Sequence, residues 1–249
     1  MMRFQRFAKS VFRALCRVLL RLDITGLQHV PPQGRLLIMM NHVHFLDPIV
    51  VSAFIRRDMG IMSKIENFLP VLGYLVKWYG SFPVRRGEFD LAAIRASLAY
   101  LESERGLLMA PEGTRSKTGG LQPGLDGLAL LAIRGDAPIL PVAIHGHEAF
   151  LDNLKRLRRT PFHMTIGQPF RLILPEGAEN GNGQRRVHLQ RSTQAAMYEL
   201  ARHLPEAYRG VYADLENAPQ GYIQRIAPSH DSAFRPKGSQ AAQREGVRP

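Results

Sequence analysis

The chain has 249 residues, of which 45% are hydrophobic and 22% are charged. This composition is typical of a folded globular protein and excludes collagen, coiled coil and wholesale disorder. The single cysteine, Cys16, excludes an internal disulfide framework and a cysteine-rich zinc site. Lysine and arginine outnumber aspartate and glutamate by 33 to 21, so the formal charge of +12 attracts polyanions such as nucleic acid, anionic lipid or phosphorylated metabolites.

The first 22 residues concentrate this charge in an amphipathic pattern. They contain no acidic residue and the basic residues Arg3, Arg6, Lys9, Arg13, Arg17 and Arg21. Apolar residues recur between them at spacings of three and four, which predicts a helix over residues 1–22. A spanning orientation would cost about 2.5 kcal/mol or more for each central arginine, and the same arginines interrupt the apolar core that a signal peptide needs. We expect this helix to lie on a membrane surface; the alternative is that its apolar stripe packs on the rest of the protein.

Residues 23–227 alternate short apolar runs with segments of helical spacing. Buried strands are predicted over residues 36–40, 107–110 and 139–144, and helices over residues 47–55, 90–104 and 125–134. This alternation predicts a single α/β domain with a central mixed sheet flanked by helices, in which ligands bind beyond the carboxyl ends of the strands. Residues 228–249 are polar and lack apolar spacing, which predicts a disordered tail.

His42 and Asp47 follow the first of these strands. A carboxylate one turn into the next helix can fix the tautomer of such a histidine and stabilise its protonated form. This pair predicts a general base, although a His and an Asp at this spacing also occur as a purely structural pair. No serine or cysteine nucleophile lies beside it, and Cys16 belongs to the amphipathic helix, so we expect the substrate's own hydroxyl to attack directly.

Four clusters of chemically distinctive residues each lie beside a predicted strand. In order they read Asn-His-Val-His-Phe-Leu-Asp-Pro (41–48), Phe-Pro-Val-Arg-Arg-Gly (82–87), Pro-Glu-Gly-Thr-Arg-Ser (111–116) and Leu-Pro-Val (140–142). Together they resemble the four ordered blocks of the glycerolipid acyltransferases, the lysophosphatidate acyltransferases in particular. The resemblance extends from about Thr25 to Tyr212. It implies that His42 and Asp47 are catalytic.

The second and third blocks imply substrate-binding residues. Arg86 resembles the family arginine that holds the acceptor's phosphate, and a guanidinium suits phosphate because it offers two parallel hydrogen bonds. Glu112, Gly113, Thr114 and Arg115 resemble the block that binds the glycerol phosphate, where the glycine permits close backbone approach. A turn with a structural Glu–Arg pair is the alternative for this block. The chain has Leu125 where the family commonly supplies a lysine, which leaves the acceptor headgroup open.

His44 departs from the small residue that the family most often carries. It creates a His-x-His pair that could bind zinc near a carboxylate, but Leu46 and Asp47 break the pattern of dinuclear metallohydrolases. We therefore expect neither a metal nor an organic cofactor.

The resemblance implies transfer of a fatty acyl group from acyl-CoA or acyl-carrier protein to the free hydroxyl of 1-acylglycerol 3-phosphate, giving phosphatidate. The alternatives are another lysolipid acceptor or a basic protein that binds nucleic acid or membranes without catalysis. No zinc finger, aromatic RNA-binding block or Gly-x-x-Gly loop occurs, so we expect no nucleic-acid partner. The expected location is the cytoplasmic face of the cell membrane, attached peripherally through the N-terminal helix.

Overall fold

The computed structural model describes residues 2–67, 72–85, 90–175 and 182–226. Within them, one nine-stranded sheet has the order β1-β7-β6-β2-β5-β3-β4, and β8 pairs with β6 and β9. The strands are β1 (Leu20–Thr25), β2 (Leu36–Met40), β3 (Met59–Lys64), β4 (Ser81–Val84), β5 (Gly106–Met109), β6 (Ile139–His145), β7 (Thr160–Ile166), β8 (Phe170–Leu172) and β9 (Ile223–Arg225). The α-helices are α1 (Met2–Leu19), α2 (Asp47–Phe54), α3 (Leu72–Trp78), α4 (Leu91–Glu102), α5 (Gly127–Arg134), α6 (Phe150–Lys155) and α7 (Asn182–Ala201).

The sheet is mixed, as the sequence predicts. Strands β6, β2, β5, β3 and β4 all run parallel to one another. On the other side of β6, β7 runs antiparallel to β6 and parallel to β1. The carboxyl ends of β2, β4, β5 and β6 therefore lie along one edge of the sheet. The four sequence blocks belong to this group of strands and their following loops.

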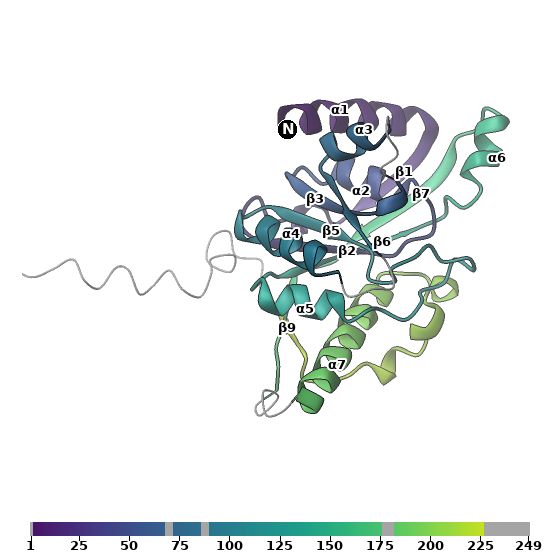
Figure 1. The fold of residues 1–249 in the computed structure, drawn as a ribbon. Coiled ribbons are helices and arrows are strands. Elements are labelled where there is room, and N and C mark those ends of the chain that lie inside the picture. The colour runs from purple at the N-terminus through teal and green to yellow at the C-terminus, as the bar shows by residue number, and fades with distance from the viewer. Residues whose placement is uncertain (1, 68–71, 86–89, 176–181, 227–249) are drawn as a thin grey trace, which may run out of the picture.

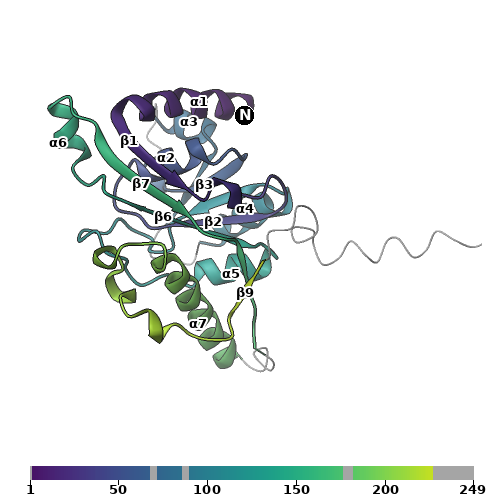
Figure 2. The same ribbon diagram turned by 180° about the vertical axis from the view of Figure 1, so that it is seen from behind.

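Helices cover both faces of the sheet. Figure 1 shows α1 and α2 above it and α5 and α7 below it, and Figure 2 shows the same layers from behind. Leu36, Ile38 and Met40 of β2 belong to the core beneath α2, while Leu37 and Met39 belong to the core against α5 and α7. A strand buried on both faces needs a continuous apolar run, which is why the sequence predicts β2, β5 and β6 well.

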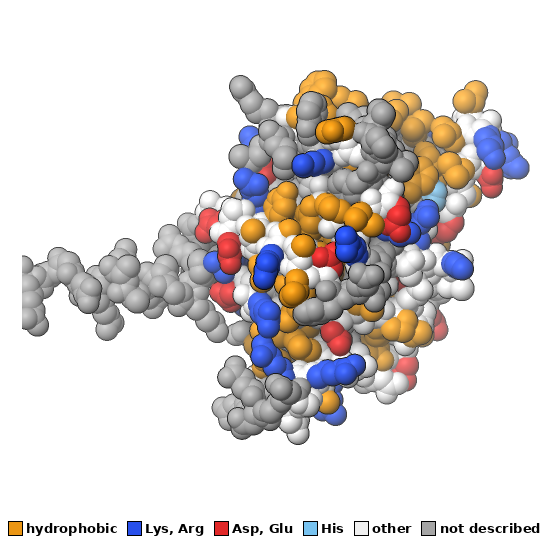
Figure 3. Space-filling model, viewed as in Figure 1, with side chains coloured by type: hydrophobic (Ala, Val, Ile, Leu, Met, Phe, Trp, Pro, Cys, Tyr) orange, Lys and Arg blue, Asp and Glu red, His pale blue; other side chains and the backbone are white. Residues whose placement is uncertain are grey.

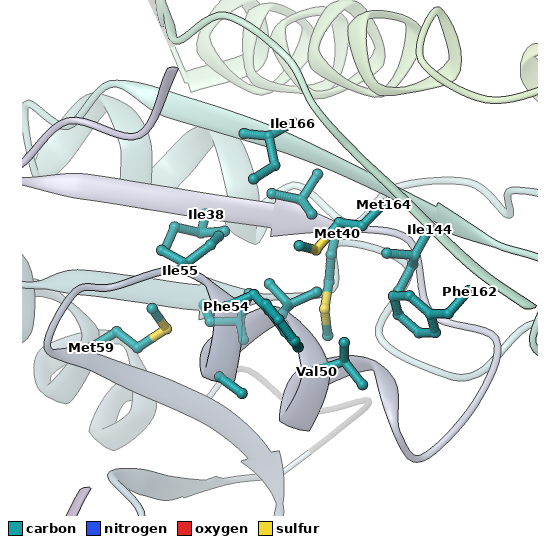
Figure 4. Packing of buried hydrophobic residues seen from close by; sticks show 14 of the residues in the cluster. Ile38, Met40, Val50, Phe54, Ile55, Met59, Ile144, Phe162, Met164 and Ile166 are labelled. Carbon is teal, nitrogen blue, oxygen red and sulfur yellow. The ribbon is translucent and has the colours of Figure 1, made fainter. Parts of the chain in front are cut away.

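The upper core is built from aliphatic and aromatic side chains of several elements. Figure 4 shows Ile38 and Met40 of β2 close to Val50 and Phe54 of α2, with Phe162 of β7 beside them. This packing fixes α2 on the sheet, and α2 begins at Asp47. The position of the predicted catalytic carboxylate is thus set by the core.

The N-terminal helix ends earlier than the sequence predicts. α1 stops at Leu19, and residues 20–22 belong to β1, where they pair with Thr160–Phe162 of β7. Leu20 is buried in the core, and pairing with β7 satisfies the backbone groups that a longer helix would have satisfied internally. The helical part of the expected segment 1–22 is therefore residues 2–19 among the described ones.

α1 packs on the domain through a partly polar side. Gln5 Nε2 donates to the carbonyls of Met59 (2.9 Å) and Tyr79 (2.6 Å), and Lys9 Nζ donates to the carbonyl of Arg57 over 2.7 Å. Burial lowers the pKa of Lys9 to about 8. These bonds tie the helix to the rest of the domain through side chains that a hydrophobic pattern would assign to solvent.

The apolar stripe of α1 is divided between the core and the surface. Phe12 and Leu19 pack against the upper core, but Phe7 and Val18 are each 67% exposed, and Val11 and Leu15 are exposed as well. The alternative in which the stripe packs on the domain is therefore wrong for its outer half. None of the helices in the described part of the chain is long and apolar enough to cross a bilayer.

The remaining elements largely follow the sequence prediction. Helices α2, α4 and α5 and strands β2, β5 and β6 lie within a few residues of where their patterns place them. Strand β1 and helix α6 were not expected. The tail predicted over residues 228–249 lies outside the described residues.

Candidate active site

His42 and Asp47 form a hydrogen-bonded pair at the carboxyl end of β2. The two atoms that meet are Nδ1 of His42 and Oδ2 of Asp47, 2.8 Å apart. A carboxylate can only accept, so Nδ1 carries the proton and Nε2 keeps its lone pair. No described residue forms a hydrogen bond with Nε2. The pair has the geometry of a general base held in one tautomer by a carboxylate.

Asp47 is surrounded by hydrogen-bond donors. Its side chain is 0% exposed, and the backbone N–H groups of Val43 and His44 each donate to Oδ2 over 2.7 Å. Burial raises the pKa of Asp47, but hydrogen bonds from His147 and His42 outweigh it, so the pKa lies below its ordinary value. The carboxylate therefore stays ionised in a place without water, where its charge acts strongly on His42.

A second histidine holds the other oxygen of this carboxylate. Nε2 of His147 donates to Oδ1 of Asp47 over 2.5 Å, and the His147 side chain is completely buried. Its Nδ1 is buried without a hydrogen-bond partner among the described residues. The result is a His–Asp–His arrangement, in which Asp47 is held from two sides.

The third block holds the backbone of His42. The N–H of His42 donates to Oε1 of Glu112 over 2.9 Å, and its carbonyl accepts from the N–H of Ser116 over 2.7 Å. The second oxygen of Glu112 accepts from the N–H of Gln122 over 3.0 Å. Burial raises the pKa of Glu112, and the backbone bonds act against that rise. Glu112 thus supports the loop that carries His42, and its contact with substrate stays a prediction.

Asn41 fixes the same loop from the strand below. Its Nδ2 donates to the carbonyl of Ile144 and its Oδ1 accepts from the N–H of Ile144, both over 2.8 Å. Asn41 is buried, so the side chain extends the β2–β6 ladder by one pair of bonds. His42 therefore leaves the sheet at a defined position.

Gly113 turns the third block toward the surface. Its φ of 68° is left-handed, and a Cβ added there would lie 2.6 Å from Cδ1 of Leu125. Thr114 and Arg115 follow it and are exposed, and the charge of Arg115 contributes to the lowered pKa of His44, for which burial is the main cause. Arg115 thus places a positive charge on the surface near His44.

The remaining predicted residues are placed as follows. Arg86 lies outside the described residues; Arg85, just before it, donates its N–H to Asp90 over 2.9 Å at the start of α4. Leu140 and Val142 are fully buried in β6, so the fourth block is a core strand beside β2.

His44 lies in an aromatic cluster with Phe45, Phe150 and His147. Among the described residues, no group of three His, Cys, Asp or Glu side chains is arranged to hold a metal ion. Cys16 is buried in the upper core, where burial raises the pKa of its thiol.

Three residues of this site were not singled out by the sequence. Asn41, Ser116 and His147 act through contacts with residues 74 to 103 positions away, which no local pattern reveals. One feature of the sequence points to His147, because it lies two residues after the strand of the fourth block. That strand, β6, pairs with β2, which carries His42 at its end.

Comparison with known proteins identifies the family. The sequence model of the acyltransferase family matches residues 21–145, half of the chain. The 1-acyl-sn-glycerol-3-phosphate acyltransferase of Limnanthes douglasii is 30% identical over 146 residues, covering 56% of this chain and 51% of that protein. The chloroplastic enzyme BAT2 of Brassica napus is 27% identical over 128 residues, covering 50% of this chain and 37% of that protein.

The human 1-acyl-sn-glycerol-3-phosphate acyltransferase alpha is 25% identical over 160 residues, covering 63% of this chain and 54% of that protein. The chain thus spans about half the length of these curated relatives or less. The crystal structure of the 1-acyl-sn-glycerophosphate acyltransferase PlsC from Thermotoga maritima has the same fold, with a TM-score of 0.54 at 20% identity over 82% of this chain and 80% of that one. The chain belongs to the acyltransferase family.

Proposed function

We propose that the protein transfers a fatty acyl group from an acyl-CoA or acyl-carrier-protein thioester to the free hydroxyl of 1-acylglycerol 3-phosphate, giving phosphatidate. The observation that carries this is the 2.8 Å bond between His42 and Asp47 at the carboxyl end of β2. The names of the matched relatives support the choice of acceptor.

The proposed reaction has one proton transfer in each direction. Nε2 of His42 takes the proton of the acceptor hydroxyl as its oxygen attacks the thioester carbonyl carbon. Asp47 stabilises the imidazolium that forms. When the C–S bond breaks, the imidazolium returns the proton to the leaving thiolate. A thioester is already activated, so positioning and this proton transfer are the main tasks of the protein, and no metal or organic cofactor enters the scheme.

The acceptor's phosphate would be held by Arg86 and Arg115. Arg115 is exposed beside the His42 loop, which supports a contact with an anionic group there. Gly113 and Thr114 would bring backbone and hydroxyl donors to the glycerol phosphate. Glu112 would act chiefly by holding His42, with its remaining lone pairs available to the acceptor.

Product analysis tests this function. Purified protein is incubated with a panel of lysolipids and with acyl-CoA or acyl-carrier-protein donors, and the products are identified by mass. We expect phosphatidate, and losses of a hundredfold or more in turnover for His42→Ala and for Asp47→Asn. Full activity of His42→Ala would refute the mechanism. Preference for an acceptor without phosphate would refute the choice of acceptor.

We also propose that α1 attaches the protein to the cytoplasmic face of the cell membrane. Phe7, Val11, Leu15 and Val18 form the exposed apolar strip, and arginines flank it. Each basic residue near an anionic surface contributes about 1 kcal/mol to binding. Sedimentation of Phe7→Ser/Val18→Ser with anionic vesicles tests this. Unchanged binding would exclude α1 as the attachment site.

A further inference from the structure

We propose that a second element, the α6 knuckle, docks on an anionic lipid bilayer together with α1. The α6 knuckle is residues 150–159, which comprise α6 and the turn that leads into β7. This goes beyond the proposed function, because it concerns a binding surface that is measured without turnover.

The knuckle exposes leucine side chains to solvent, where they do not contribute to the hydrophobic core. Leu157 is 93% exposed, and Leu151 and Leu154 are also exposed large hydrophobic residues. Leu157 has a φ of 52°, a left-handed conformation in which glycine or asparagine would cost less than leucine. The side chain of Leu157 therefore stabilises the protein only if it meets an apolar phase.

The same segment is strongly basic. Lys155, Arg156, Arg158 and Arg159 are exposed, and Asp152 is the one acid of the knuckle. The Lys155–Asp152 pair is long, at 3.9 Å. Exposed leucines interleaved with cations complement a surface that has anionic headgroups over an apolar interior.

The knuckle is physically continuous with α1. Nη2 of Arg159 donates to the carbonyls of Arg17 (2.9 Å) and Leu20 (2.6 Å) at the end of α1. Beside this contact a hollow of about 520 Å³ opens over β1 and the start of β7, lined by Arg21, Leu22, Asp23, Arg159, Pro161 and His163. With two arginines against one aspartate, this hollow suits an anionic headgroup.

α1 and the α6 knuckle also lie at the same end of the molecule. Figures 1 and 2 are related by a turn about the vertical axis, and both place α1 and α6 at the upper end. Figure 3 shows hydrophobic side chains along this end over α1 and beside α6, where Lys and Arg also gather. One flat surface can therefore contact both elements at once.

This placement brings the candidate active site to the bilayer. Phe150, the first residue of α6, is buried against the His42 loop, with ring centroids 5.8 Å from His44 and 6.4 Å from Phe45. Phe45 is itself exposed. A lysolipid that leaves the bilayer beside the knuckle would thus enter next to His42.

A bilayer fits this surface better than an acidic protein does. The leucines stand on a protruding tip and not in a groove, and a protrusion gains its burial by inserting into a soft phase. An acidic carrier protein, which the basic residues alone would also suit, becomes an outcome of the test.

The test measures binding of the full chain to vesicles of phosphatidylcholine, with and without phosphatidylglycerol. The charge variant is Lys155→Gln/Arg156→Gln/Arg158→Gln, and the apolar variant is Leu154→Ser/Leu157→Ser. The matched control is Arg185→Gln/Arg186→Gln/Val187→Ser, which changes exposed residues of α7 at the opposite end of the molecule. Arg159 is left unchanged because it holds α1.

We expect the charge variant to bind anionic vesicles about a hundredfold more weakly. The apolar variant should lose about tenfold on both kinds of vesicle, and the control should bind as the original protein does. If circular dichroism shows that the double variant is misfolded, the single variant Leu157→Asn replaces it. Asparagine tolerates the left-handed backbone of this position.

Two results would overturn the proposal. One is vesicle binding by the knuckle variants that equals that of the control. The other comes from measuring the binding of the same variants to acyl-carrier protein. The proposal is overturned if the charge variant loses binding to acyl-carrier protein while its binding to vesicles is unchanged. Failure of the proposed function looks different, because the unaltered protein would then fail to acylate dissolved short-chain lysophosphatidate.

Discussion

Replacing His147 tests whether the second oxygen of Asp47 matters for catalysis. His147→Leu removes the donor at Oδ1 of a carboxylate that is completely buried. A hydrogen bond to a charged group contributes about 1.5–3 kcal/mol. If the loss of this bond lets the Asp47 carboxylate, and with it His42, leave the reacting geometry, kcat drops by about 10- to 100-fold. KM should change little, because His147 is buried behind Asp47.

The pH profile separates positioning from simple loss of structure. Without His147 the charge of Asp47 acts on His42 alone, which favours the protonated ring. The acidic limb of kcat should therefore move to higher pH. His147→Gln can present an amide N–H near the same place and should restore most of the activity.

The assay is steady-state acyl transfer across pH for His147→Leu, His147→Gln and the control His145→Leu, which changes the last residue of β6 without touching Asp47. A double variant with Asp47→Asn completes the cycle. If His147→Leu costs the same factor in the presence and in the absence of the Asp47 carboxylate, His147 does not act through Asp47 and the reasoning fails.

Three further substitutions test the supporting structure. Glu112→Gln cannot accept from both backbone N–H groups, so the free energy of unfolding measured in urea should fall by about 1–3 kcal/mol. We expect kcat to fall by a larger factor than KM rises, and a rise in KM alone would indicate substrate contact instead. Gly113→Ala should lower the melting temperature by a few degrees, since the left-handed φ costs about 1–2 kcal/mol and the new Cβ meets Leu125; an unchanged melting curve would contradict this. The pKa of Lys9 is about 8 in the fold against 10.5 ordinarily, so the unfolded chain holds the proton more tightly between these values and stability should rise with pH there. Urea unfolding at about pH 8 and pH 10 should show this rise relative to Lys9→Met, and parallel curves would refute it.

The sequence predicted well those features that depend on neighbouring residues. β2, and β6 from Ile139 to Ile144, are apolar because both faces are covered, and His42 and Asp47 are five residues apart in the chain. Their mutual bond follows from local geometry.

The sequence could not show contacts that the topology creates. Gln5 and Lys9 are buried because their side chains donate hydrogen bonds to the carbonyls of Met59 and Arg57. A polar part of α1 therefore faces the domain. His147 reaches Asp47 only because β6 lies beside β2. Residues 20–22 join a sheet edge whose existence depends on β7.

Because α1 shares the core of the domain through Cys16 and the adjoining Leu20, whatever binds its outer side binds the folded state and not the unfolded one. Under the proposed attachment of α1 to a membrane, lipid is a thermodynamic ligand of folding. At a lipid concentration a hundredfold above the dissociation constant, mass action adds about 2.7 kcal/mol to the stability of the whole domain. The melting temperature of this protein should accordingly report the lipid around it, and a preparation stripped of lipid should be the least heat-resistant form.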